Sequence, residues 1–196
     1  MKKIIAISMA LLLLAGCSAA PATPADPATQ NNNNAAADTS KIKTGLGVIT
    51  TIKNSTDATD EKDGTVQVDT TMAAVSVDEK GVIVSVTLDV AQTKVPFDKA
   101  GTIKADKTAE VPTKKDLGDK YGMKVASKIG KDWHEQAKAF EDWCVGKTLD
   151  QVMGLSVVQR DESHPAVPND PALTSSVTIT VDAYQQAISE AIKNAK

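Results

Sequence analysis

The stretch TVQVDTTMAAVSVDEKGVIVSVTLDV, residues 65–90, decides the fold. Two runs rich in β-branched residues, each alternating between apolar and polar positions, flank the short segment DEKG at residues 78–81. A period of two is typical of strands, and a glycine at the end of the segment supplies the positive φ that a tight turn needs. The stretch therefore predicts an antiparallel hairpin. Its alternation shifts by one residue near residues 72–74, which indicates a β-bulge there.

A first strand is expected before this hairpin. Residues 41–53 alternate loosely between apolar and polar positions. Within them, Gly45-Leu46-Gly47 lacks the third glycine of a dinucleotide-binding fingerprint, which would fall at Thr50. We therefore interpret the two glycines as a bend in a strand.

Two main helices are expected after the hairpin. The first has one apolar face, with members spaced by four, three and four residues: Trp133, Ala137, Phe140 and Cys144. We expect Gly146 to end this helix. The second helix closes the sequence, and its apolar face is formed by Val181, Tyr184, Ala187, Ile188, Ala191 and Ile192.

The segments between these elements complete the expected fold. Residues 97–123 are rich in Lys, Asp, Gly and Thr and should be mostly surface loop. Residues 148–151 resemble a capping box that opens a short helix, and strands are expected over residues 155–158 and 175–181. Residues 41–196 are thus expected to form a single α+β domain, with an antiparallel sheet around the central hairpin and helices packed on one face.

The start of the chain indicates export. Lys2 and Lys3 precede an almost unbroken apolar run over residues 4–14, which is typical of a secretory signal. The run is shorter than the roughly 20 apolar residues that a membrane-spanning helix needs. LAGC follows at residues 14–17 and resembles a lipobox, in which the cysteine thiol receives a lipid before the signal is cleaved. We expect residues 1–16 to be a lipoprotein signal peptide and Cys17 to be the lipidated anchor.

Residues 17–40 are expected to comprise the lipidated Cys17 and a disordered tether. Residues 18–40 contain no aromatic or large aliphatic residue, so burial of apolar surface cannot offset the entropy of ordering them. A coil of about 23 residues has an end-to-end distance on the order of 25 Å. The predicted location is therefore a cell membrane, with the domain facing its extracytoplasmic side.

Composition narrows the classes of partner. The formal net charge is −3, and it becomes −5 when Lys2 and Lys3 are removed with the signal. This acidity argues against nucleic acid, which selects a concentrated basic surface. The aromatic content of 3% argues against a stacked carbohydrate-binding platform. With Cys17 lipidated, Cys144 has no disulfide partner, and its place on an apolar helix face predicts a buried, unreactive thiol.

No motif of a familiar enzyme or metal site is found. His134 could be the first histidine of the helical zinc-protease motif, but Lys138 occupies the position of the second histidine. His164 is expected in a solvated loop, and no Gly-x-Ser-x-Gly elbow occurs. We assign no catalytic and no metal-binding residues, and we expect a binding or electron-carrying protein rather than a classical enzyme.

One arrangement points to a known family. Residues 173–179, LTSSVTI, precede the amphipathic C-terminal helix, and residues 63–65, DGT, open the first strand of the hairpin. The arrangement resembles the FMN-binding domain family, which includes flavinylated subunits of Rnf-type and sodium-pumping electron-transfer complexes and related bacterial surface lipoproteins. The resemblance extends from about residue 64 to the C-terminus, with short matching strings. It implies a threonine that carries FMN through a phosphoester bond.

The resemblance assigns the cofactor-binding residues by position. Ser175, Ser176 and Thr178 stand for the Ser/Thr, the glycine and the modified threonine of the family's Ser/Thr-Gly-Ala-Thr stretch, and Val177 replaces its alanine. Ala172 stands where the family usually has an acidic residue. A segment just before a helix is suited to a phosphate, because free N–H groups and the helix dipole favour an anion there.

Two functions remain open at this stage. The first is a lipid-anchored lipoprotein that binds FMN and transfers electrons to a redox partner in the envelope. The second is a non-enzymatic lipoprotein that keeps the fold without flavin and binds a small ligand or an envelope protein, with the lysine-rich residues 99–131 as a contact surface. In both cases the membrane is a partner through the lipid, and nucleic acid is not.

Overall fold

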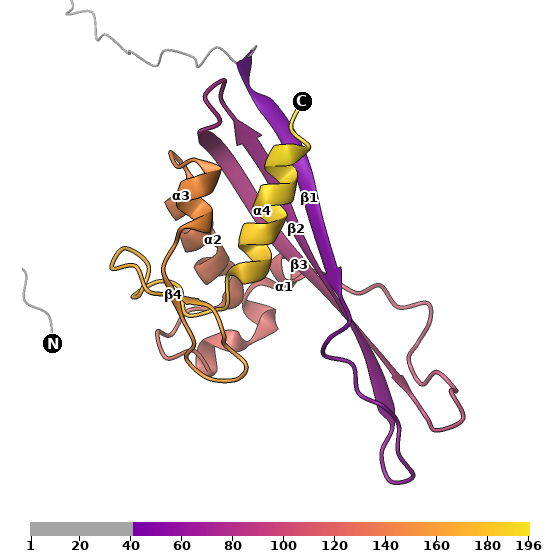
Figure 1. The fold of residues 1–196 in the computed structure, drawn as a ribbon. Coiled ribbons are helices and arrows are strands. Elements are labelled where there is room, and N and C mark those ends of the chain that lie inside the picture. The colour runs from indigo at the N-terminus through magenta and orange to yellow at the C-terminus, as the bar shows by residue number, and fades with distance from the viewer. Residues whose placement is uncertain (1–40) are drawn as a thin grey trace, which may run out of the picture. The chain divides into compact units, whose positions relative to one another are not determined.

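The predicted hairpin lies in a three-stranded antiparallel sheet with the order β1-β2-β3 (Figure 1). The strands are β1 (Lys43–Thr51), β2 (Gly64–Val77) and β3 (Ile83–Phe97). This computed structural model describes residues 41–196. Cys17, the expected signal peptide and the expected tether therefore lie outside the described residues.

The turn between β2 and β3 has the predicted form. Gly81 adopts a φ of 75°, and one carboxylate oxygen of Asp78 accepts hydrogen bonds from the backbone N–H groups of Lys80 and Val82, at 2.8 and 2.9 Å. Asp side chains commonly close turns in this way. The hairpin prediction is confirmed.

The bulge lies in β3 and not in β2. Ser76 pairs with Ser85 and Val77 pairs with Ile83, so Val84 is the extra residue. The bulge directs Ile83, which is fully buried, to the inner face and leaves Val84 39% exposed. The prediction of a bulge at residues 72–74 is wrong, because burial alternates through that part of β2 without interruption.

The helices cover one face of the sheet, as predicted (Figure 1). In this layer α4 (Asp182–Lys193) contacts β1 and β2, whereas α2 (Trp133–Cys144) contacts β3. Between β3 and α2 the chain forms α1 (Lys114–Leu117), η2 (Gly118–Tyr121) and η3 (Met123–Val125), and α3 (Leu149–Met153) follows α2. No helix among residues 41–196 combines the length and the apolar character needed to span a bilayer. The α+β class and the single layer of helices are confirmed.

The apolar spacing in α2 correctly identifies its buried face. All four of the predicted positions are at most 2% exposed. Gly146 follows the helix with a φ of 82°, and Thr148 forms the predicted capping box at the start of α3. Cys144 is buried, and this burial raises the pKa of its thiol to about 12, so the thiol is protonated and unreactive at neutral pH.

The segment before α4 is a loop, so the prediction of a strand over residues 175–181 is wrong. The N–H groups of Ser176 and Val177 both donate to the carbonyl oxygen of Leu173, at 2.8 and 2.7 Å, and form a turn. Val177 is fully buried and Ile179 is 8% exposed. The alternation of apolar residues in this segment therefore reflects loop side chains that are buried in the core. Of the strand expected over residues 155–158, the last two residues form β4 (Val157–Val158), which pairs with β5 (Val167–Pro168).

Each edge of the sheet is covered over part of its length. On β1, the backbones of Thr44 and Lys196 exchange two long hydrogen bonds of 3.3 Å, and the side-chain amide of Asn194 donates to the carbonyl oxygen of Leu46 at 3.0 Å. On β3, the N–H of Leu88 donates to the carboxylate of Glu141 in α2 at 2.7 Å. Backbone groups occupied in this way are not available to strands of other chains.

The two glycines of β1 allow α4 to lie directly on the strand. A Cβ atom added to Gly47 would lie 1.9 Å from the carbonyl oxygen of Ala187, and one added to Gly45 would lie 2.0 Å from that of Ala191. Side chains at these positions would therefore push the helix away from the sheet. The strand prediction is confirmed, but the glycines serve a close approach of two backbones and not a bend.

We expect Gly47→Ala to lower the free energy of unfolding by at least about 2 kcal/mol, because the added methyl group overpacks a contact that backbone atoms already fill. Urea denaturation would measure the change. The control is Val48→Thr, one residue away on the open face, which should stay within about 0.5 kcal/mol of the original protein. Equal stability of the Gly47→Ala protein would contradict the close contact.

Candidate functional site

The inner face of the sheet changes from apolar to polar along its length. Near the hairpin turn it carries Ala73, Val75, Ile83 and Leu88, which are buried under the helices. Towards the other end the inward residues are Gln67, Asp69, Thr71 and Gln92. Polar groups at core-facing positions need partners or a solvent-filled space. Asp69, Thr71 and Gln92 line a pocket with a volume of about 540 Å³, a size typical of small-molecule sites, and Gln67 donates to Asp69.

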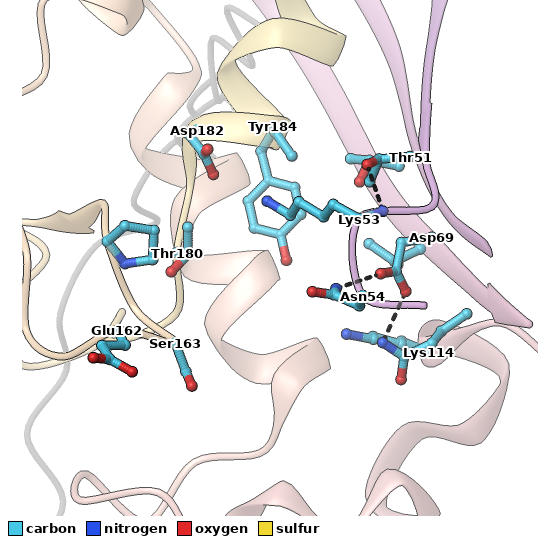
Figure 2. A pocket seen from close by; sticks show the side chains of 15 residues that line it. Thr51, Lys53, Asn54, Asp69, Lys114, Glu162, Ser163, Thr180, Asp182 and Tyr184 are labelled. Carbon is cyan, nitrogen blue, oxygen red and sulfur yellow. Dashed lines mark hydrogen bonds between the residues drawn. The ribbon is translucent and has the colours of Figure 1, made fainter. Parts of the chain in front are cut away.

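Opposite walls of this pocket come from distant parts of the chain (Figure 2). The sheet and the residues after β1 contribute Thr51, Lys53, Asn54, Asp69, Thr71 and Gln92. The opposite wall includes Glu162, Ser163, Thr180, Asp182 and Tyr184, where the loop enters α4. Lys114, the first residue of α1, contributes a second ammonium group besides that of Lys53.

Asp69 is the best-connected polar group of the pocket. Its carboxylate accepts hydrogen bonds from the side-chain amides of Gln67, at 3.0 and 2.9 Å, of Gln92 at 2.9 Å and of Asn54 at 2.8 Å. Partial burial alone would raise the pKa of Asp69. The hydrogen bonds from the amides, of which the one from Gln92 has the largest effect, outweigh burial and hold the pKa below its usual value. Asp69 is therefore an oriented anion at neutral pH.

Lys114 is positioned by aromatic rings. Its ammonium nitrogen lies 4.9 Å from the ring centroid of Tyr121 and 5.7 Å from that of Trp133, within the range of cation–π attraction. The indole nitrogen of Trp133 donates to the hydroxyl of Tyr184 at 2.9 Å, and burial raises the pKa of that hydroxyl. The pocket thus has a rigid aromatic corner with a cation above it.

Two smaller pockets continue from the first. One, of about 220 Å³, shares Lys114 and Thr180 with the large pocket. The other, of about 170 Å³, shares His164 and Ile179 with the middle one and is also lined by Thr178. We refer to the three together as the groove. Its wall follows residues 178–184, from the loop into the first turn of α4.

Of the three residues assigned by the family resemblance, Thr178 lines the groove and Ser175 and Ser176 do not. Ser175 is exposed, and the hydroxyl of Ser176 donates to the carbonyl oxygen of Leu173 at 3.2 Å. The structure therefore leaves Thr178 as the only one of the three with direct access to the groove.

Gln136 in α2 holds Thr178 in place. Its side-chain oxygen accepts from the N–H and the hydroxyl of Thr178, at 2.8 and 3.2 Å. Its amide nitrogen donates to the carbonyl oxygen of Lys131 and to the hydroxyl of Ser127, both at 3.1 Å, which fixes the orientation of the amide. Gln136 is fully buried, so this is a rigid support for the loop.

The surroundings of Thr178 suit a phosphate group. Arg160, which donates to the carbonyl oxygen of Thr178 at 3.0 Å, and Lys128 line the same pocket. Farther along, the hydroxyl oxygen of Thr180 is buried and has no hydrogen-bond partner. The bulky Val177 is directed into the core and fully buried, so it does not narrow the groove. On these observations the residues fit the phosphate of FMN.

The described residues contain no group of three or more His, Cys, Asp or Glu side chains placed to hold a metal. His164 instead pairs with Asp161, with its Nδ1 atom 2.6 Å from a carboxylate oxygen. This hydrogen bond, together with one from Arg160, lowers the pKa of Asp161.

Sequence reasoning missed Asp69, Lys114 and Thr180. The sequence did contain a signal for Asp69. Polar residues occupy alternate positions in the first part of the predicted strand, and these positions lie on the same face as the valines that follow, which face the core. Lys114 and Thr180 gave no such signal, since tertiary contacts alone bring them to the groove.

Comparison with known proteins shows no family for this chain. No protein-family model and no solved structure matches it. A 40-residue segment is 48% identical to part of a chlorophenol reductase from Desulfitobacterium hafniense. The matched segment covers 20% of this chain and 12% of the reductase, so it carries no conclusion about the whole of either protein.

We expect the Asp69 carboxylate to stabilise the fold in a pH-dependent way. The pKa of Asp69 is lower in the folded than in the unfolded chain. Its contribution to stability is therefore fully present above the unfolded-state pKa of about 3.9 and is lost as the pH falls through the folded-state pKa. At pH 7, Asp69→Asn should lower the free energy of unfolding by about 1 kcal/mol, allowing for solvent screening.

Urea denaturation at pH 7 and at about pH 3 tests this, with the exposed Asp57→Asn as control. The stability difference caused by Asp69→Asn should shrink at the lower pH, and the control should show little difference at either. A difference independent of pH would show that the charge of Asp69 is not what the amide groups stabilise.

Proposed function

We propose that this protein is a lipid-anchored extracytoplasmic lipoprotein that binds FMN in the groove and transfers electrons outside the cytoplasm. The observation that carries the flavin assignment is the position of Thr178, which lines one end of the groove together with Arg160 and Lys128. The anchor assignment depends on the signal and on Cys17, at the start of the sequence.

The end of the groove near Thr178 supports binding of the phosphate. A guanidinium group binds a phosphate through two parallel N–H donors, and a lysine adds a point charge. Arg160 donates through Nη1 to the carbonyl oxygen of Thr178 at 3.0 Å and through Nε to Asp161 at 3.2 Å, so it is held at this position before any ligand arrives. A phosphoester on Thr178 would cost the hydrogen bond from its hydroxyl to Gln136, but the one from its N–H would remain.

The large pocket supports binding of a polar ring system. Its oriented groups include the carboxylate of Asp69 and the amides of Asn54 and Gln92, which can pair with donors and acceptors on a ring edge. The ammonium groups of Lys53 and Lys114 can favour negative charge on a bound flavin. When bound, FMN would supply the one- and two-electron chemistry, and these residues would position it and influence its potential.

Intact-mass analysis of the protein from its native membrane tests both parts of the proposal. We expect a mass that starts at an acylated Cys17 and includes one FMN, and a yellow purified protein. Thr178→Val should remove the FMN mass and leave the acyl mass, because the threonine hydroxyl is the proposed site of attachment.

The control is Thr174→Val, which removes an exposed threonine hydroxyl from the same loop and should keep the flavin. A colourless protein of unmodified mass would contradict the flavin assignment. A chain that retains Met1, or carries an unmodified Cys17, would contradict the anchor assignment independently. A yellow Thr178→Val protein that loses its colour on denaturation would assign noncovalent binding.

A further inference from the structure

A lysine-rich segment comprises η2, η3 and the residues that lead to α2, and it carries the most exposed large apolar side chain of residues 41–196. Val125, at the end of η3, is 98% exposed, whereas the next most exposed large apolar side chain, Ile52, is 62% exposed. Single exposed apolar residues are common on protein surfaces. Val125 differs from these because lysines lie on both sides of it in the sequence. We call residues 118–131, which contain these lysines, the basic loop.

The basic loop concentrates positive charge. It contains four lysines, Lys120, Lys124, Lys128 and Lys131, and one acidic residue, Asp119, whereas the whole chain has a net charge of −3. Across residues 41–196, none of these four lysines lies within 4 Å of a carboxylate. Lys120, Lys124 and Lys128 are exposed, so their charges are available to a partner.

The loop is also held in shape. The buried carboxylate of Asp132, which is 1% exposed, accepts from the N–H groups of Met123 and Lys124 at 3.3 and 3.4 Å, as well as capping α2. The Ser127 hydroxyl accepts from the Gln136 amide. A preorganised loop loses little conformational freedom when it binds.

We propose that the basic loop docks the domain on a membrane surface that carries anionic phospholipid headgroups, with Val125 entering the interface between headgroups and acyl chains. Lysines attract the headgroup charge, and an apolar side chain at the centre of a basic patch gains from partial burial. The choice of a membrane as partner rests on the proposed lipid anchor, which would keep the loop close to a bilayer. Since Lys128 and Ser127 also line the smallest pocket, docking would place the Thr178 end of the groove near the membrane.

Vesicle co-sedimentation tests the docking without the anchor. The chain from Ser18 to Lys196 contains the whole described core and lacks the acylated residue. We expect it to bind vesicles of phosphatidylcholine with about one-quarter phosphatidylglycerol, not to bind pure phosphatidylcholine, and to dissociate in about 0.5 M salt, because added salt screens the charges.

Substitutions locate the surface. The triple variant K120Q/K124Q/K128Q should bind the anionic vesicles about 100-fold more weakly, from roughly fivefold per lysine. Val125→Ser should weaken binding severalfold with the charge unchanged. The matched control is K62Q/K94Q/K107Q, which removes three exposed lysines elsewhere and should weaken binding far less.

Several results would overturn the proposal. They are absence of vesicle binding, equal loss in the two triple variants, and no effect of Val125→Ser. Binding to polyglutamate beads that depends on the loop, without vesicle binding, would instead assign an acidic protein as the partner. Because neither the flavin nor the acyl anchor takes part in this experiment, failure here leaves the mass analysis of Cys17 and Thr178 unaffected.

Discussion

The direct contact of the α4 backbone with β1 determines where the C-terminal helix, and with it one wall of the groove, lies. Gly45 and Gly47, two residues apart, place two hydrogen atoms on the inner face of the strand, and the carbonyl oxygens of Ala191 and Ala187 occupy the space that side chains would need. The helix is therefore fixed along the edge strand, and its first turn lies beside the residues that follow β1. The groove exists because the helix begins there and the sheet continues beyond it.

The sheet is divided into two halves by the polarity of its inner face. The half near the hairpin turn is apolar and forms the core with α2 and α4. In the other half, the inward positions carry amides and a carboxylate, which satisfy each other around Asp69. A fully apolar inner face would be the simpler way to extend the core. The polar residues are therefore best explained by the pocket they line, in which Lys53 and Lys114 balance part of the acidic charge.

Much of the fold follows from periodicity in the sequence. The hairpin, the apolar face of α2 and the glycine after it were predicted correctly, because each depends on local spacing or on a local φ requirement. Residues 175–181 were predicted wrongly as a strand, since alternating Val177, Ile179 and Val181 bury their side chains from a loop as well as they would from a strand. In the candidate site, Thr178 was assigned through a family resemblance and stays a prediction, and Asp69 was missed. The reason is physical: the groove joins residues more than 100 positions apart, and no local pattern encodes their distance.

The central claim is that the groove along residues 178–184 is the ligand site, and amide NMR spectra of the chain from Ser18 to Lys196 test it most directly. The protein, produced without a flavin transferase, would be titrated with free FMN. The account predicts saturable shifts concentrated in residues 178–184 and in the side-chain amides of Asn54, Gln67 and Gln92. Shifts concentrated on the open face of the sheet, or unchanged spectra at millimolar FMN, would contradict it.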